Sequence, residues 1–208
     1  MRLKTAIVIS IGICLILIRF SGCGESVPKD EEIAAVTRHI AEDFMDELKT
    51  ELMTALEDTV TGTVGAIYVC AEKAPEISAS YSSLPGLTVK RTSKKLRNPN
   101  NAPDEYELKT LEMLESRPAF GSQDHYEWEI TDGNKRFRFV RAIKTSSVCL
   151  KCHGNPEKMD KEVKAAIAER YENDQATGFK LEDLRGILTV SLEWPEGKAV
   201  YDSISGGL

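Results

Sequence analysis

The stretch "SSVCLKCHGNPEK", residues 146–158, gathers the residues best suited to chemistry in this chain. Cys149 and Cys152 are separated by two residues, and His153 follows the second cysteine directly. At this spacing the two thiols can add to both vinyl groups of a porphyrin, and the adjacent histidine then lies beneath the iron. The motif therefore predicts one covalently attached c-type haem, held by Cys149 and Cys152, with His153 as an axial ligand of the iron.

Other uses of a cysteine pair fit this chain less well. A structural zinc site needs four ligands, whereas the motif supplies three and no second pair exists. A thioredoxin-like C-x-x-C usually opens a helix after a strand and needs no histidine behind it. A disulfide framework would be expected to use more of the five cysteines. The remaining alternative is an exposed turn in which the C-x-x-C is incidental.

The composition indicates a globular protein and argues against several functional classes. The chain has 208 residues, of which 41% are hydrophobic and 29% charged, and this suits one globular domain. The formal net charge is −6 and no basic face is evident, so we expect no nucleic-acid partner. The sequence contains no nucleophile elbow, phosphate loop or zincin motif, so we do not expect an enzyme.

The N-terminal residues predict export from the cytoplasm. The positive start "MRLKT" precedes an apolar run from Ala6 to Ile18, and the polar segment "RFSGCGES" follows it. This order is typical of a secretory signal. The apolar run is shorter than the roughly 20 residues that cross a bilayer, so an uncleaved anchor is the less favoured alternative.

The end of this signal also resembles a bacterial lipobox. Small residues precede Cys23 in "FSGC", although Phe20 replaces the usual aliphatic residue. We therefore predict lipidation of Cys23, with the domain in the periplasm or cell envelope and a lipid anchor in the membrane. The predicted parts are a lipoprotein-type signal peptide (1–22), a linker (23–30) and one domain with N-terminal helices (31–208).

The first half of the domain is predicted to be helical. Residues 30–57 carry apolar side chains at steps of three and four, which indicates a long amphipathic helix. A second helix is expected over residues 59–83, with Pro75 as a bend or break and Cys70 on the helix. The first helix could pack on a second copy of the chain, in a homodimer, or within its own molecule.

The second half is predicted to form a small antiparallel sheet. Residues 125–130 and 136–143 alternate in polarity around Asp132-Gly133, which indicates a β-hairpin. Further strands are expected at 87–93 and 186–194, and helices from about Pro103 and over 157–171. The sum is an α+β domain, in which a haem on the open face of the sheet would be covered by the early helices.

Four segments resemble a known family when they are read in order. They are "AIYVCAEKAP", "VKRTSKKLRNPNNAPDEYE", "CLKCHG" and "GFKLEDLRGILTVSL". Their order is similar to that of a family of bacterial c-type haem proteins with a PAS-like fold, which includes exported single-domain proteins and the sensor regions of kinases and chemoreceptors. The resemblance covers most of residues 60–193. It implies a PAS-like sheet and a redox- or gas-sensing role.

The resemblance also implies a second axial ligand. In this family the cysteine of the segment matched by "AIYVC" ligates the iron opposite the motif histidine, and this position is Cys70 here. From the residues alone, Cys70 could equally be a small core residue of a helix. The other side chains that could take the position are two histidines and four methionines: His39, His125, Met45, Met53, Met113 and Met159.

Arg91 and Arg97 are candidates for binding the haem propionates. Both lie in a segment that carries the resemblance, and the guanidinium fork can bind both oxygens of a carboxylate. Their alternative is a solvated basic turn, since Lys90, Lys94 and Lys95 are close in the sequence.

These residues predict a haem-binding sensor module, with a low-potential electron-transfer cytochrome as the alternative. The distal ligand separates the two, because a carrier keeps this ligand through the redox cycle and a sensor can release it. Only a short segment follows residue 193, so a sensor of this kind is expected to act through an unidentified protein partner.

Overall fold

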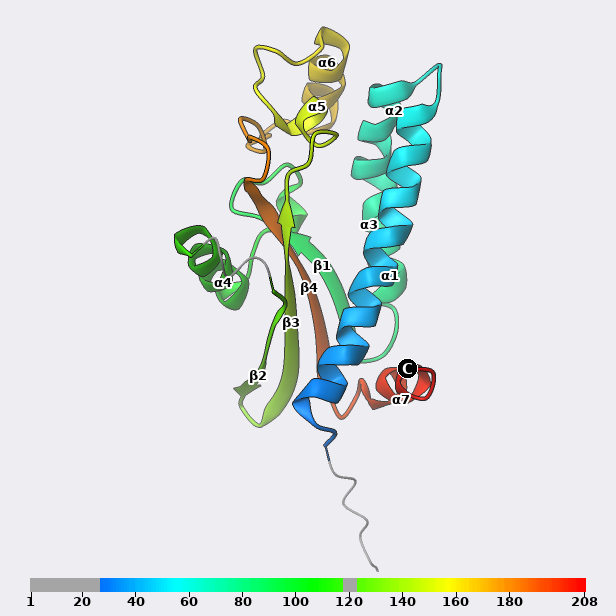
Figure 1. Cartoon of the computed structure of the whole chain (residues 1–208), viewed down its shortest axis with the longest axis vertical. Coiled ribbons are helices and arrows are strands. Elements are labelled where there is room, and N and C mark those ends of the chain that lie inside the picture. Colours follow the sequence, from blue (N-terminus) through cyan, green and yellow to red (C-terminus); the bar gives the residue numbers. More distant parts are fainter. Residues whose placement is uncertain (1–26, 118–122) are drawn as a thin grey trace, which may run out of the picture.

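The computed structural model describes residues 27–117 and 123–208, and in these residues four strands form one antiparallel sheet in the order β1-β4-β3-β2 (Figure 1). The strands are β1 (Leu87–Thr92), β2 (His125–Thr131), β3 (Asn134–Lys144) and β4 (Leu184–Trp194). The helices are α1 (Asp30–Glu57), α2 (Gly62–Tyr68), α3 (Ala74–Tyr81), α4 (Glu105–Ser116), α5 (Leu150–His153), α6 (Lys161–Arg170) and α7 (Lys198–Ser205). The α+β class is confirmed.

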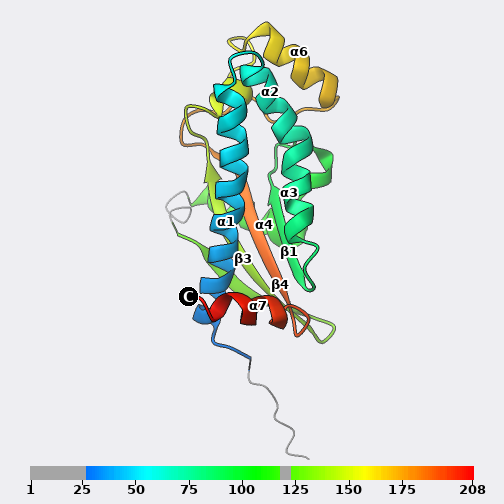
Figure 2. The same cartoon turned by 90° about the vertical axis from the view of Figure 1, so that its right-hand side faces the viewer.

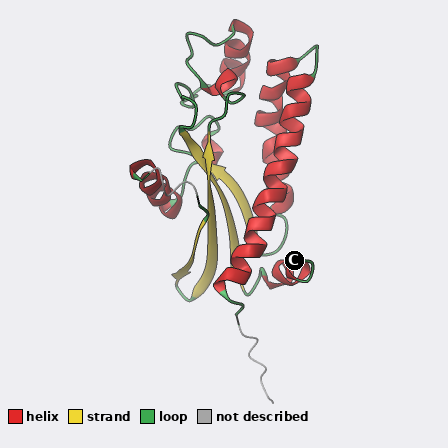
Figure 3. Cartoon of the chain, viewed as in Figure 1, coloured by secondary structure: helices red, strands yellow, loops and turns green. Residues whose placement is uncertain are grey.

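The helices lie on both faces of the sheet and at its two ends. Figures 1 and 2 show α1 and α3 along one face, α4 on the other face, α7 at one end, and α5 with α6 at the opposite end. Figure 3 shows the loops that join the sheet to α5 and α6, between the end of β3 and the start of β4. The end of the sheet that carries α5 and α6 is the part that positions the predicted haem motif.

Helix α1 forms because its apolar stripe matches the helical period. Asp30, Glu31 and Glu32 occupy its first turn, where negative charge is favourable. The buried side chains then follow at helical spacing and pack on the sheet: Ile33, Val36, Ile40, Phe44 and Leu48. The apolar face of α1 is thus covered within its own molecule, as one of the two alternatives expected.

The predicted hairpin is confirmed. Asp132 and Gly133 both have positive φ angles, 53° and 83°, which is the backbone of a two-residue type I′ turn. Thr131 pairs with Asn134 next to this turn. The turn fixes the register, so that Phe137 and Phe139 face the core beneath α1.

The helix is not broken at Pro75, because its helical backbone continues through this residue. A π-helical segment, Val69–Lys73, joins α2 to α3, and the N–H of Ala74 donates to the carbonyl of Val69 five residues earlier. Pro75 then lies in the first turn of α3, where its missing N–H costs little. The wider π turn, which carries Cys70, takes the place of a break.

The remaining elements follow the sequence closely. The strands at β1 and β4 are confirmed, and the helix expected from about Pro103 begins at Glu105 because Asp104 caps it. Helix α6 is shorter than the range expected. The predicted signal peptide and Cys23 lie outside the described residues. Within residues 27–117 and 123–208, no helix is both long and apolar enough to cross a membrane.

Candidate functional site

A cavity of about 380 Å³ lies at the end of the sheet that carries α5. This volume falls in the range of about 300–1,000 Å³ that is usual for cofactor and ligand sites. The sequence favoured a site on the open face of the sheet, but that face is filled by the core beneath α1. The apolar stripe of α1 runs past the sheet and forms one wall of the cavity, with Met45, Leu48, Leu52, Met53 and Leu56.

The cysteine motif forms the opposite part of the cavity. Thr145 anchors the chain after β3, because its N–H donates to the carbonyl of Asp183 at 2.9 Å. One turn of helix, α5, follows and places Cys149, Cys152 and His153 on the cavity. The Cys149 and Cys152 thiols are free. Burial raises the pKa of the Cys152 thiol to about 11, more than the nearby Arg97 lowers it.

His153 is held in one orientation and one tautomer. Its Nδ1 lies 2.7 Å from the carbonyl oxygen of Ala176, and this oxygen can only accept, so Nδ1 carries the proton. Its Nε2 therefore keeps a lone pair, which is the usual state of a metal-ligating histidine. Burial, aided by the charges of Arg185 and Arg97, lowers the pKa of His153 to about 3. The ring stays neutral at physiological pH.

Cys70 enters the same cavity from the π-helical segment. Its side chain is half-buried and its thiol is free, and it lines the cavity together with Cys152 and His153. The structure thus places Cys70 on the same cavity as Cys152 and His153, which lie far from it in the sequence. The axial role of Cys70 stays a prediction, and its position is compatible with that role.

The other candidates for the second axial position divide into two groups. Met45 and Met53 line the cavity from α1. His39 does not line the cavity; it is partly exposed, and its Nε2 lies 3.4 Å from Asp43 on the same helix. Three residues belong to other parts of the fold and do not line the cavity: His125 at the start of β2, Met113 on α4, and Met159 in the cluster beneath α6.

Arg97 lies in the cavity wall with its guanidinium already engaged. Its Nε and Nη2 donate to the two carboxylate oxygens of Asp174, at 3.1 and 2.9 Å. Nη2 also donates to the carbonyl of Cys152 at 2.7 Å. Asp174 in turn accepts from the N–H of Ala176, the residue that binds His153. This pair therefore fixes the backbone around the motif, and its contact with a propionate stays untested.

Arg91 also lines the cavity, at the end of β1, and Arg185 joins it from the start of β4. Arg91 Nε is buried without a hydrogen-bond partner, and burial lowers the pKa of this side chain. Burial first, then the like charges of Arg97 and Arg91, lower the pKa of Arg185 to about 10. The sequence did not single out Arg185, although it stands in "GFKLEDLRGILTVSL", a segment that carries the resemblance.

The comparisons with known proteins agree with this geometry. A family model described as Tll0287-like matches residues 28–193. Among solved structures, the chain is similar to the cyanobacterial haem protein Tll0287, with 23% identity and a TM-score of 0.57 over 81% of this chain and 99% of that chain. This likeness supports a PAS-like α+β fold. No curated protein matched the chain. Because the family model covers well over half of its residues, the chain belongs to the Tll0287-like family.

Proposed function

We propose that this protein is an exported c-type haem protein that senses redox state or a gas through its iron. The observation that carries the proposal is the state of His153. Its Nδ1–H is bound to Ala176 and its neutral ring lines the cavity shared with Cys149, Cys152 and Cys70. A motif that was incidental would not need this fixed, neutral imidazole.

The residues of the cavity fit a haem. Two thiols lie on one side, apolar side chains of α1 lie on another, and arginines stand at the end of the sheet. A bound haem would supply an iron that changes oxidation state and can bind small gases. Cys149 and Cys152 would hold the porphyrin, while His153 and Cys70 would ligate the iron. The haem protein Tll0287 supports the haem part of this proposal, since the chain shares its fold.

Covalent attachment is the first test. We expect the protein from cells that mature c-type haem to keep its haem after denaturation and extraction with acidified organic solvent. Cys149→Ser with Cys152→Ser should lose it, because no thioether can then form. Cys70→Ser is the matched control and should keep the haem. Haem that leaves the wild-type protein with the solvent would overturn the proposal.

A low-potential electron carrier is the alternative function, and the behaviour of Cys70 on reduction separates the two. Cys70 lies on the irregular turn between α2 and α3, and such turns are frequent at functional sites. A sensor should release Cys70 on reduction and bind CO at the ferrous iron. A carrier should remain six-coordinate and leave its spectrum unchanged under CO.

We also propose that the protein is a lipoprotein of the cell envelope, on the basis of "FSGC" at residues 20–23. Cys23→Ser should move the protein from the membrane fraction to the soluble fraction. Mass spectrometry of the wild-type N-terminus should find lipidated Cys23. A wild-type chain that begins at Met1 would show an uncleaved anchor instead.

A further inference from the structure

Three arginines, Arg91, Arg97 and Arg185, line the cavity. In the described residues, only one carboxylate forms an ion pair with any of them. Asp174 is bound by Arg97. In the described residues no ion pair joins Arg91 or Arg185 to an acidic side chain, and Arg185 makes a long hydrogen bond of 3.4 Å to the carbonyl of Lys95. Two cations thus face the cavity without a counter-ion. Cations removed from water in this way are costly unless something anionic binds them.

The backbone of β1 and β4 determines where Arg91 and Arg185 lie. On β1, Leu87 and Val89 face the core beneath α1, and the alternation of a strand puts Arg91 on that same apolar face. Arg91 therefore occupies a position on β1, beside the cavity, at which the strand alternation predicts a core side chain.

Arg185 is directed into the cavity by a β-bulge. Ile143 pairs with Gly186 and Lys144 with Leu184, so Arg185 is the extra residue between them. Bulges of this kind turn a side chain away from its regular face. A Cβ on Gly186 would lie 2.2 Å from the carbonyl oxygen of Thr92, so glycine is what allows the ends of β1 and β4 to approach. Both arginines consequently reach the same wall.

We propose that Arg91 and Arg185 form a carboxylate cradle that binds the two propionates of the haem, an inference that rests on the proposed function. Each guanidinium offers a planar fork that matches a carboxylate. An apolar ligand with two anionic groups supplies both the charge and the polar partners that the two side chains lack. Arg97 is a positioning residue in this arrangement, because Asp174 and two backbone carbonyls already engage it.

The stability of the protein with and without haem tests the cradle. In the full chain produced without haem, Arg91→Gln and Arg185→Gln should each raise the Tm, since an uncompensated cation is removed. In the haem-loaded protein the same variants should lower it, by roughly 2–4 °C each. Arg97→Gln is the matched control and should lower the Tm of both forms. The cradle would be overturned if Arg91→Gln or Arg185→Gln shifted the Tm of the two forms in the same direction.

Porphyrin binding separates the cradle from the proposed function. The full chain with Cys149→Ala and Cys152→Ala is titrated with iron protoporphyrin IX and with its dimethyl ester, which has no propionate charge. We expect about tenfold or greater preference for the free acid, reduced by Arg91→Gln and by Arg185→Gln. Equal binding of acid and ester overturns the cradle alone. A wild-type protein that holds no haem, with no porphyrin binding here, overturns the proposed function and the cradle together.

Discussion

His153 owes its fixed orientation to three residues that are distant from it in the sequence. Ala176 accepts the Nδ1 proton, Asp174 binds the N–H of Ala176, and Arg97 binds Asp174. The chain of contacts fixes the imidazole before any metal arrives. Burial, followed by the charges of Arg185 and Arg97, lowers the pKa of His153, although the hydrogen bond to Ala176 and the charge of Asp174 act in the opposite direction. His153 is therefore a neutral imidazole that is fixed at the cavity by its protein contacts alone.

The proposed ligation of the iron by Cys70 can be tested by spectroscopy. We expect ferric iron in the wild-type protein to be six-coordinate and low-spin, with His153 and the Cys70 thiolate as ligands. Cys70→Ala should abolish the low-spin thiolate signal in electron paramagnetic resonance and raise the reduction potential, because an anionic ligand stabilises ferric iron. Met45→Leu and Met53→Leu are the controls and should change neither measurement. A spectrum altered by a methionine variant and unaffected by Cys70→Ala would identify methionine as the ligand.

The sequence could reveal the motif but not all of the residues that serve it. Cys149, Cys152 and His153 lie close together in the sequence, so their spacing is visible. Cys70 and Arg91 became candidates mainly through a resemblance, and both line the cavity. Arg185 was missed because a bulge, not the alternation of the strand, determines where it points. Partners such as Asp174 and Ala176 meet the motif only after the chain has folded.

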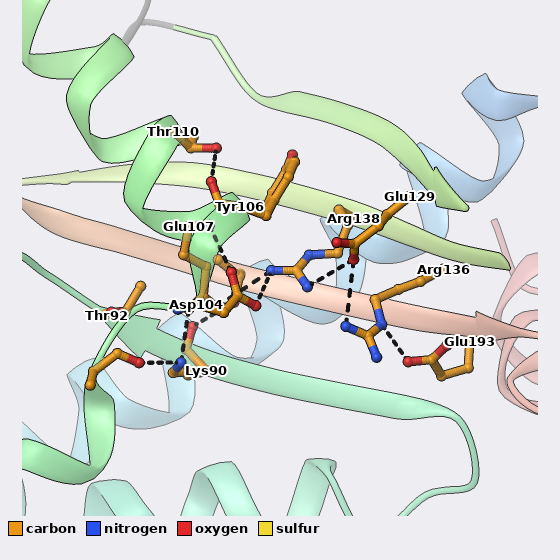
Figure 4. A network of polar contacts seen from close by, with 12 residues as sticks. Lys90, Thr92, Asp104, Tyr106, Glu107, Thr110, Glu129, Arg136, Arg138 and Glu193 are labelled. Atoms are coloured by element: carbon orange, nitrogen blue, oxygen red, sulfur yellow. Dashed lines mark hydrogen bonds and ion pairs between the residues drawn. The ribbon is translucent and has the colours of Figure 1, made fainter. Parts of the chain in front are cut away.

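At the scale of elements, a polar network holds α4 on the sheet (Figure 4). Asp104 caps α4, and Glu107 on its first turn is buried and accepts from Lys90 and Thr189. Arg138 on β3 donates to Asp104 at 2.7 Å and to Glu129 at 3.3 Å. A small apolar cluster lies beside the network, so α4 depends on these charges to a greater degree than α1 does.

Arg138→Met should therefore be strongly destabilising. Its side chain is 3% exposed, and its loss takes a buried cation from Glu107, which is also 3% exposed, and from the partly exposed Asp104 and Glu129, at a cost of about 3 kcal/mol, because Glu107 keeps its pair with Lys90. Arg136→Met is the control in the same network, because its side chain is 41% exposed and its ion pairs should contribute roughly 1 kcal/mol or less. Urea denaturation measures both. Equal losses for the two variants would contradict this account of the network.

Asp124 connects α1 to β3 and makes stability depend on pH. Burial opposes its ionisation, but hydrogen bonds and charges from Arg141 and Arg38 outweigh burial and lower the pKa of Asp124. A lowered pKa adds stability above the unfolded value near 4, and this stability is lost as the pH falls through the folded pKa. Asp124→Asn should reduce the Tm at pH 7, and the difference from wild type should shrink below about pH 4. Exposed Asp46→Asn is the control, and a difference that persisted at low pH would refute the linkage.

The joint between α2 and α3 shows what a helical pattern cannot predict. The sequence indicated one helix over residues 59–83, with Pro75 as a bend or break. The chain instead widens into a π turn before the proline, because the carbonyls there find donors one residue further on. The periodicity of α1 and the hairpin turn were visible because each depends on local sequence alone.

Two of the three apolar clusters in the described residues differ in how they relate to the cavity. The larger one lies between α1, α3 and the sheet, and it is closed by protein side chains. A smaller cluster gathers beneath α6 and is built from Ile67, Val163, Ala166, Ile167 and Tyr171. Cys152 packs against this cluster, and Tyr171 also lines the cavity. The cavity thus adjoins the smaller cluster, whereas the packing of the sheet belongs to the larger one.

Haem attachment should therefore stabilise one end of the molecule and leave the other nearly unchanged. Hydrogen exchange followed by mass spectrometry would compare the haem-loaded protein with the Cys149→Ser, Cys152→Ser variant. We expect slower exchange with haem in α2, α5, α6 and the last turns of α1, because these elements gain a packed partner only when the cavity is filled. The middle of β3 and β4 is the internal control, since its side chains are buried in the larger region with or without haem. A uniform change along the chain would mean that the two regions unfold as one unit. An unchanged α6 would mean that the smaller cluster is complete without the cofactor.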